Sequence, residues 1–330
     1  MADASIDVTG IGNAIVDVLA QAEDAFIEAQ GLTKGTMALI DEPRARALYA
    51  KMAQAVQMSG GSVANSMAGL ASLGGRAAYI GKVARDPLGE AFSHDIRAVG
   101  VHFETVPSGS GVPTARCFVL VSPDAQRTLN TYLGACLELG PDDIDEALIA
   151  RSKVVYLEGY LWDPPAAKEA FVKAATLARR AGRKVALSLS DPFCVQRHRK
   201  ELEALVDQHV DILFANEHEV CALYEAPHLE QAMAAVRGHC ELSVLTLSAK
   251  GSVVLAGDET FAVQAAKVDK VVDTTGAGDL YAAGFLRGYT TGRSPSECGR
   301  LWALCAAEII SHFGARPEVL LADLAVRAGA

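Results

Sequence analysis

The sequence lacks the cysteine pattern that would stabilise a small secreted fold or hold zinc. Its seven cysteines are an odd number, are widely spaced and include no Cys-x-x-Cys pair. A disulfide framework and a structural zinc site are therefore not indicated. Most of these cysteines lie in apolar stretches, where a free cysteine behaves as a small buried hydrophobic residue.

Long hydrophobic runs and basic runs are also missing. No apolar stretch approaches the roughly 20 residues needed to cross a bilayer, and residues 1–5 lack the basic and apolar segments of a signal peptide. The 30 basic residues are outnumbered by 40 acidic ones, and no extended run of Lys or Arg occurs. This balance argues against nucleic acid or a membrane surface as the partner. We therefore expect a cytoplasmic protein that binds neither.

No Gly-x-x-x-x-Gly-Lys-Ser/Thr segment is present, so a nucleotide would have to be held without a P-loop. Gly10-Ile11-Gly12 follows a predicted strand and starts like the dinucleotide fingerprint. However, Ile15 stands where a third glycine would permit close helix–strand packing. We favour a tight turn after the first strand, and a dinucleotide oxidoreductase stays an alternative that rests only on Gly10 and Gly12.

The chain does have enough apolar residues for a large core, since 50% of its 330 residues are hydrophobic. From about residue 147 onward, short apolar strands alternate with amphipathic helices. This pattern is typical of a mostly parallel sheet covered by helices on both faces. The segment 113–132, rich in Thr, Val, Phe and Leu, has instead the pattern of a β-hairpin. We predict one α/β domain with a small inserted β lid.

The strongest candidate site is the segment Asp273-Thr274-Thr275-Gly276-Ala277-Gly278-Asp279. We predict that a strand at 270–272 leads into it and that a helix begins near Gly278. Free N–H groups at such a helix start can hold an anion. Asp279 can then accept a proton from a hydroxyl while the amides hold a transferring phosphoryl group. An aspartate is also favourable at a helix start for stability alone.

A second glycine pair, Gly60-Gly61, precedes a predicted helix at 62–73. Such a turn lets the backbone approach a ligand closely, and Asn65 would point toward that ligand from one turn into the helix. The other interpretation is a simple helix start with Ser62 as its N-cap. Both interpretations are equally consistent with this segment alone.

Taken together, these residues resemble the ribokinase-like (PfkB) carbohydrate and nucleoside kinases, and most closely the adenosine kinases among them. The first family motif is similar to residues 60–89 and the second to residues 273–284, and Asn-x-x-Glu stands between them at 216–219. The order and spacing of the three match the family over nearly the whole chain.

The resemblance implies a fold. The implied fold is a three-layer α/β/α sandwich with a mostly parallel central sheet, formed by a single domain at 1–330. A small β-sheet lid is implied at about 13–20, 35–41 and 112–133.

The resemblance also implies roles in phosphoryl transfer. Asp279 matches the base that activates the acceptor hydroxyl, and Gly276, Ala277 and Gly278 match the anion hole. Arg127 matches an arginine that clamps phosphate during transfer. An exposed hairpin cation is the alternative for Arg127.

ATP and Mg²⁺ are the implied cofactors. Asn216 and Glu219 match the motif that organises Mg²⁺ and the phosphates through water, although the same pair is also a good helix cap. Asp273 and Thr275 match positions that bind a monovalent cation in relatives, which makes K⁺ a candidate further cofactor. The positions that match the nucleotide-lining segment are Thr246, Ser248 and Gly251.

On the acceptor side, Asn13 and Asp17 match the pattern Gly-Asn-x-x-x-Asp, whose polar side chains bind the vicinal hydroxyls of a ribose. A solvated strand end is the alternative for Asp17. Gly61 and Asn65 match further ribose contacts, and Ser62 stands where ribokinases usually carry lysine. This departure favours a nucleoside over free ribose. The candidate base-contacting residues, each of which could equally be lid packing, are Met37, Leu129, Tyr160 and Leu161.

The implied activity is ATP-dependent phosphorylation of adenosine at its 5′ hydroxyl. A sugar kinase of the ribose or fructose type and another nucleoside kinase are the alternatives within the family. The intact Asp279, Gly276 and Gly278 argue against a non-catalytic nucleoside-binding relative. Because adenosine kinases more often work as monomers, we expect a monomer, with a dimer left open.

Overall fold

The structure of this chain is a computed structural model that describes residues 4–124 and 126–328. Residues 1–3, at the start considered above, and residue 125, in the predicted lid segment 112–133, lie outside the described residues. The strands are β1 (Ile6–Ile11), β2 (Ile15–Gln21), β3 (Met37–Leu39), β4 (Val56–Gly60), β5 (Ala77–Ile80), β6 (His102–Phe103), β7 (Ala115–Val121), β8 (Arg127–Tyr132), β9 (Ser152–Glu158), β10 (Lys184–Ser188), β11 (Ile212–Asn216), β12 (Leu242–Thr246), β13 (Ser252–Ala256) and β14 (Glu259–Val263). The α-helices are α1 (Asp24–Ala29), α2 (Glu42–Tyr49), α3 (Ser62–Ser72), α4 (Pro87–Ala98), α5 (Glu146–Ala150), α6 (Pro165–Arg180), α7 (Pro192–His209), α8 (Glu217–Leu223), α9 (Leu229–Val236), α10 (Ala277–Thr290), α11 (Pro295–Ile309) and α12 (Leu321–Ala328).

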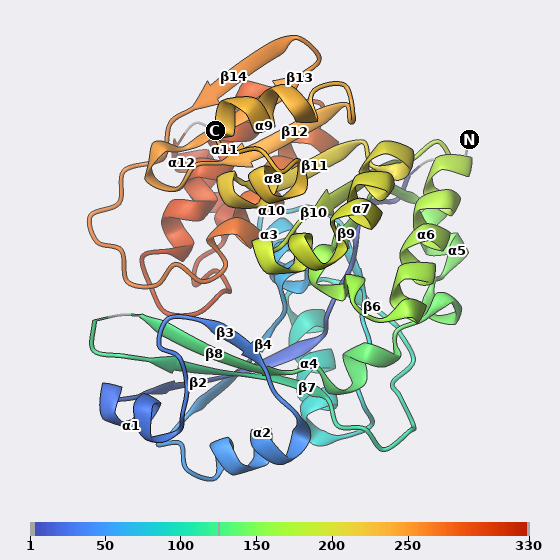
Figure 1. Cartoon of the computed structure of the whole chain (residues 1–330). Coiled ribbons are helices and arrows are strands. Elements are labelled where there is room, and N and C mark those ends of the chain that lie inside the picture. The colour runs from blue at the N-terminus through green and yellow to red at the C-terminus, as the bar shows by residue number, and fades with distance from the viewer. Residues whose placement is uncertain (1–3, 125, 329–330) are drawn as a thin grey trace.

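The strands form two sheets, a large one inside the layered domain and a small one below it (Figure 1). Within the described residues the large sheet has nine strands in the order β14-β13-β12-β11-β10-β9-β1-β5-β6. The strands from β12 to β6 run parallel, and β13 and β14 form an antiparallel hairpin at one edge.

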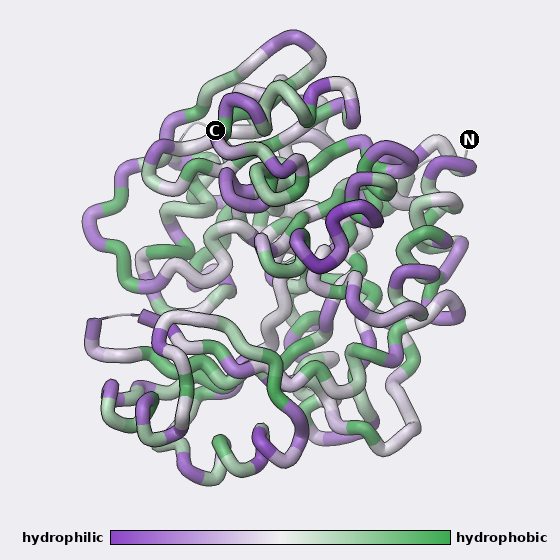
Figure 2. The backbone as a smooth tube through the Cα atoms, in the orientation of Figure 1, coloured by the Kyte–Doolittle hydropathy of each residue, from purple (hydrophilic) through white to green (hydrophobic). Residues whose placement is uncertain are grey.

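Each central strand is apolar on both faces because helices cover the large sheet on both sides. In β9, Val154 and Tyr156 enter a core shared with α3, α4, α10, α11 and α12. Val155 and Leu157 enter a second core shared with the helices from α5 to α9. The alternation follows from the two-residue period of a strand. In Figure 2 hydrophobic stretches follow the inner strands while loop tips such as the β13–β14 turn are hydrophilic. The predicted three-layer α/β/α class is confirmed.

The small sheet has the order β3-β8-β7-β2-β4. The predicted lid segments contribute β2, β3, β7 and β8, whereas β4 completes the sheet at 56–60, outside those segments. Helices α1 and α2 pack against one face of the sheet through Ile27, Ala45 and Leu48. Its other face carries Cys117 and Leu129 toward the large sheet. That this sheet moves as a lid stays a prediction.

The predicted strand at 270–272 is wrong. Residues 270–274 are irregular, and the N–H of Val272 donates to the carbonyl of Ile310 at the end of α11, 2.8 Å away. The short apolar run therefore finds its backbone partner at a helix end and not in a sheet, and Val271 is 54% exposed. Ser62 is also not the N-cap of α3, because Gly61 holds that position.

In the part of the chain that the structure describes, no helix is both long enough and apolar enough to cross a bilayer.

Candidate active site

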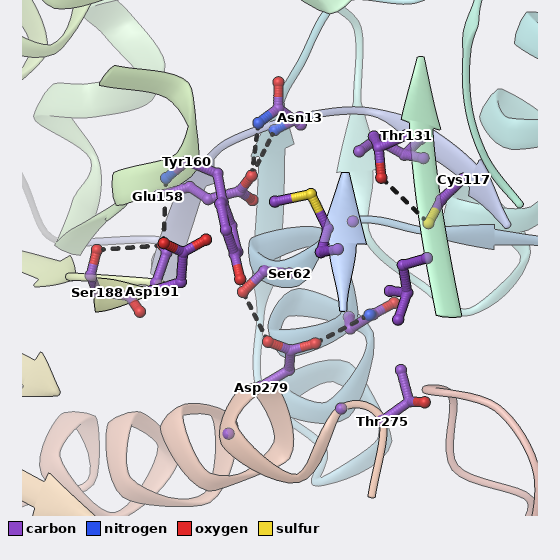
Figure 3. A pocket seen from close by; sticks show the side chains of 18 of the residues that line it. Asn13, Ser62, Cys117, Thr131, Glu158, Tyr160, Ser188, Asp191, Thr275 and Asp279 are labelled. Atoms are coloured by element: carbon purple, nitrogen blue, oxygen red, sulfur yellow. Dashed lines mark hydrogen bonds between the residues drawn. The ribbon is translucent and has the colours of Figure 1, made fainter. Parts of the chain in front are cut away.

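A cavity of 680 Å³ lies between the carboxyl edge of the large sheet and the small sheet. In a parallel sheet, ligands bind outside the carboxyl ends of the strands. Here the residues that end or follow β1, β9, β10, β11 and β12 all line the cavity, namely Asn13, Glu158, Ser188, Asn216 and Thr246. The start of α10 faces them from the opposite side (Figure 3).

Asp279 lies in the first turn of α10 and is held by two side chains of α3 (Figure 3). Ser62 Oγ donates to Asp279 Oδ1 over 2.6 Å, and Asn65 Nδ2 donates to Oδ2 over 3.0 Å. Burial raises the pKa of Asp279, while these two hydrogen bonds and the charge of Arg316 oppose the rise. The result is an oriented carboxylate whose proton affinity is higher than usual, as a general base needs.

The turn before α10 requires glycine at position 276. Gly276 is the N-cap with φ of +74°, a left-handed conformation that disfavours a side chain. A Cβ atom there would also lie 2.9 Å from Cβ of Ala315. Among the described residues, no atom beyond the adjacent residues and the backbone of α10 lies within 4 Å of the position that a Cβ on Gly278 would occupy. The first amides of α10 therefore open onto the cavity at the positive end of the helix dipole.

Glu158, at the end of β9, is a buried carboxylate that the sequence analysis did not assign. Its Oε1 accepts from Asn13 N and Nδ2, at 3.2 and 2.8 Å, and its Oε2 accepts from Val63 N at 2.9 Å. Burial raises its pKa to about 7, although these hydrogen bonds oppose the rise. Glu158 thereby fixes the loop after β1 against the start of α3. A lone glutamate ending an apolar strand was the available sequence signal.

This arrangement also explains why glycine occupies both positions of the Gly10-x-Gly12 motif. A Cβ on Gly12 would lie 2.3 Å from Glu158 Oε2, and a Cβ on Gly10 would lie 2.4 Å from Val63 Cγ1. The two glycines therefore accommodate neighbouring side chains, and the chain continues into the strand β2 and not into a helix. The dinucleotide interpretation is wrong.

Asn13 and Asn65 both line the cavity, and each has a buried amide oxygen. In the described part of the chain, neither Oδ1 atom has a hydrogen-bond partner, although each Nδ2 donates to a carboxylate. A buried acceptor without a donor costs about 1–3 kcal/mol. The two oxygens are therefore suited to receive hydroxyl groups from a ligand.

Asp17, on β2, lines the same cavity and packs against Gly60, where a Cβ would lie 2.2 Å from Asp17 Oδ2. Burial raises the pKa of Asp17 to about 7, the charge of Arg316 lowers it, and that of Asp279 raises it again. Arg316, which the sequence analysis also missed, donates from Nε to the carbonyl of Ser59 over 3.2 Å. Arg316 thus supplies the positive charge between two acidic side chains.

Asn216 and Glu219 form the capping box of α8. Asn216 Oδ1 accepts from the N–H of Glu219 at 2.9 Å, and Glu219 Oε2 accepts from the N–H of Asn216 at 2.9 Å. Burial raises the pKa of Glu219 to about 7. Both residues also line the cavity. Their donor set of carboxylate and amide oxygens fits Mg²⁺, which proteins usually hold through one or two carboxylates together with substrate phosphates and water.

The other predicted nucleotide-side residues divide into two groups. Thr246 lines the cavity, whereas Ser248 and Gly251 form the turn after β12 and are not among the residues that line it. Gly251 has φ of +89°, and a Cβ there would lie 2.0 Å from the carbonyl of Val263. The role of Gly251 visible in the structure is the close approach of two chain segments.

Three of the four predicted base-contacting residues, Met37, Leu129 and Tyr160, line the cavity. Leu161 does not, because its side chain is buried in the core against the outer helices. Phe193, at the start of α7, lines the cavity and is 71% exposed, and the sequence analysis missed it.

Arg127 extends from β8 to the loop before α10. Its Nε lies 3.0 Å from Asp273 Oδ1, and its Nη2 donates to Thr274 Oγ1 over 3.2 Å. Arg127 lines the cavity together with Thr275. The exposed-cation alternative is therefore wrong, since the side chain of Arg127 is only 16% exposed.

Comparisons with known proteins agree with this geometry. The family model described as pfkB family carbohydrate kinase matches residues 27–320. A structure of adenosine kinase from Sinorhizobium meliloti is 54% identical, covers 99% of this chain and 100% of that one, and has a TM-score of 0.94. A probable sugar kinase from Rhizobium etli is 48% identical, with 98% of each chain covered and a TM-score of 0.94. The adenosine kinase of Saccharomyces cerevisiae is 26% identical over 86% of this chain and 88% of its own.

The family match covers most of the chain and includes residues 276–278, Asp279 and the Asn216–Glu219 capping box. The chain therefore belongs to the pfkB family of carbohydrate kinases.

Proposed function

We propose that this protein is an ATP-dependent adenosine kinase that transfers the γ-phosphoryl group of ATP to the 5′ hydroxyl of adenosine. A kinase that uses an alcohol as the acceptor follows from the family. The choice of adenosine is supported by two similar proteins with that name, one of them 54% identical. The proposal includes a monomeric cytoplasmic enzyme of purine salvage that uses Mg²⁺.

The observation that carries the acceptor assignment is a pair of unpaired amide oxygens on two residues that line the same cavity as Asp279. Asn13 Oδ1 and Asn65 Oδ1 are buried acceptors without partners in the described residues. A ribose carries two vicinal hydroxyl donors, and Asp17 adds a carboxylate acceptor in the same cavity. A deoxy analogue would leave buried oxygens unpaired, which makes discrimination strong.

In the proposed reaction, the 5′ oxygen forms a bond to the γ-phosphorus while the bond from that phosphorus to the β–γ bridging oxygen breaks. The hydroxyl proton moves to Asp279, and ADP leaves. The amides at the start of α10 stabilise the charge on the transferring group. Asn216 and Glu219 would hold Mg²⁺ through water, and Mg²⁺ would supply neutralisation of phosphate charge.

A sugar kinase is the second candidate, because a 48% identical relative is named a probable sugar kinase. The composition of the cavity favours the nucleoside. Met37, Leu129, Tyr160 and Phe193 present apolar and aromatic surface that a purine base can cover and that a free sugar would leave exposed.

A panel of acceptors with coupled detection of ADP tests the proposal. We expect adenosine to be turned over far faster than ribose, fructose, guanosine or inosine. 2′-Deoxyadenosine should show a kcat/KM about 5- to 150-fold lower, because one missing hydrogen bond to a buried group costs about 1–3 kcal/mol. Faster turnover of ribose or fructose than of adenosine would assign the protein to the sugar kinases instead.

A further inference from the structure

The resemblance to the family suggests that Asp273 and Thr275 bind a monovalent cation. The groups around Asp273 show whether these two residues fit such an ion. The Asp273 side chain is 1% exposed. Its Oδ1 accepts from the N–H and the hydroxyl of Thr275, at 2.8 and 2.7 Å. Its Oδ2 accepts from the N–H of Gly314 at 3.0 Å. These neighbours are hydrogen donors, whereas a bound cation needs oxygen lone pairs.

The positive charge that Asp273 requires is already present in the protein. Arg127 Nε forms an ion pair with Asp273 Oδ1 over 3.0 Å, in addition to the two hydrogen bonds that this oxygen accepts from Thr275. A carboxylate has about four lone-pair sites in all. Arg127 is also largely buried, and a guanidinium stays charged in such a site. Asp273 and Thr275 therefore do not fit a monovalent cation while Arg127 is in place.

We propose that the Arg127 guanidinium takes the place of a monovalent cation at Asp273, and that the enzyme consequently works without K⁺. Arg127 is then a positioning residue for the loop that leads into the anion hole. The activity part of this inference depends on the proposed function, whereas the cation-binding part does not.

The contacts around Asp273 explain why its neutralisation matters to catalysis. Asp273 connects the turn at Thr275 with Gly314, and Ala315 beside Gly314 packs against Gly276 of the anion hole. Arg127 adds the small sheet to this network through β8. An unpaired charge at Asp273 would be buried and costly, so the loop would rearrange. Fixing Asp273 fixes the position of the amides that follow it.

The experiment compares KCl with choline chloride at equal ionic strength, with the melting temperature as a readout that needs no acceptor. For the wild type, we expect the same melting temperature and the same rate of ADP formation with adenosine in both salts. For Arg127→Ala, we expect a rate at least about tenfold lower. We also expect KCl to raise the melting temperature of this variant by about 2 °C or more over choline chloride, because the freed carboxylate can then bind K⁺.

Two further variants isolate the site. Arg46→Gln removes a 70% exposed arginine of α2 and should respond to neither salt. The double variant Arg127→Ala/Asp273→Asn should not show the rise in melting temperature that KCl causes in the single variant Arg127→Ala. A saturable effect of K⁺ on the wild-type melting temperature would overturn the inference, as would an Arg127→Ala variant that does not distinguish the salts. If adenosine is not the acceptor, no variant will form ADP with adenosine. The melting temperatures will then still show whether Arg127 takes the place of a cation at Asp273.

Discussion

At the scale of single residues, the site consists of acidic groups whose proton affinities depend on their surroundings. Asp17 and Glu158 both have pKa values raised to about 7, and the pKa of Asp279 is also raised. Burial is the main cause for all three. All three line the cavity, but their partners differ: Glu158 accepts from two backbone N–H groups and from Asn13 Nδ2, whereas Asp279 accepts from the side chains of Ser62 and Asn65.

Replacement of Asp279 by asparagine removes the proton acceptor and keeps the shape. We expect kcat to fall by about 10²–10⁴-fold, which is the usual contribution of general base catalysis. Adenosine affinity, measured by calorimetry, should change little because Asn13 and Asn65 remain. The exposed Asp323 of α12 provides a matched Asp→Asn control. Turnover close to that of the wild type would contradict the assignment of Asp279 as base.

Arg316 should set the pH dependence of activity. Its charge lowers the pKa values of Asp17 and Asp279, and a base works only when deprotonated. Activity should therefore be lost as the pH falls through the raised pKa values, and Arg316→Met should move this loss to higher pH. Arg316→Lys should move it less, since the charge remains. The measurement is kcat/KM from pH 5 to 9, and an unchanged acid limb in Arg316→Met would rule out this role.

At the scale of elements, the site is built from the starts of helices and the ends of strands. Helices α3, α8 and α10 each begin at the cavity, and each start places one functional group there: Asn65, Glu219 and Asp279. Glycines and polar caps occur at these starts because unpaired amides need partners and tight turns need freedom of φ.

Gly276 and Gly292 form a matched pair at the two ends of α10. Both have positive φ, +74° and +78°. A Cβ on Gly276 would lie 2.9 Å from Ala315, whereas a Cβ on Gly292 would have no atom of the described residues within 4 Å apart from those of its chain neighbours. Gly292→Ala should cost about 1 kcal/mol from strain alone. Gly276→Ala should cost roughly 1–3 kcal/mol more from overpacking, and should lower kcat. Urea unfolding and ADP formation measure the two effects, and equal losses of stability would show that crowding by Ala315 is unimportant.

The capping boxes of α8 and α11 provide a second matched pair. The pKa of Glu219 is raised by burial to about 7, while the hydrogen bonds from Ser294 lower the pKa of Glu297. A raised folded-state pKa means that the folded protein binds more protons than the unfolded chain between pH 4.5 and 7. The Glu219 contribution to the free energy of unfolding should therefore decrease as the pH rises through this window.

This contribution is at most about 3 kcal/mol, because one pKa unit corresponds to about 1.4 kcal/mol. Glu219→Gln should reduce the decrease in the free energy of unfolding with rising pH. Glu297→Gln should leave this decrease unchanged above pH 4.5. Urea unfolding at pH 5, 6 and 7.5 measures both slopes. Identical slopes in the two variants would show that burial of Glu219 does not control the titration.

At the scale of the whole molecule, the small sheet lies across the cavity from the start of α10 (Figure 1). It contributes Asp17, Met37, Cys117, Arg127 and Leu129 to the lining. An acceptor that bridges the two sheets would exclude water from the transferring group.

We therefore expect ADP formation without acceptor to be far slower than with adenosine. Hydrogen exchange of the amides in β7 and β8 should slow when adenosine is added, because the small sheet then closes on the site. Asp279→Asn with adenosine serves as the control, since it should retain the protection while turnover is lost. ATP hydrolysis at the same rate with and without adenosine would contradict a role of the small sheet in excluding water.

The sequence by itself determined the elements whose patterns are local. The apolar run from Val154 to Leu157 predicts a strand covered on both faces, and the structure places its side chains alternately in two cores. Gly276 and Gly278 before Asp279 predict an anion-binding helix start. Periodicity and turn chemistry are properties of neighbouring residues, so they can be read along the chain.

Only the tertiary structure decided which distant groups face one another. Glu158 meets Asn13 across 145 positions, Arg127 on the small sheet meets Asp273 in the loop before α10, and Leu161 turns into the core beside the lining residue Tyr160. Burial, pKa values and the partner of a charge depend on such contacts, because a carboxylate responds to everything within a few ångströms whatever its position in the chain. The segment 270–272 is predicted as a strand from its local sequence, but its backbone partner is the end of α11, which the local sequence does not reveal.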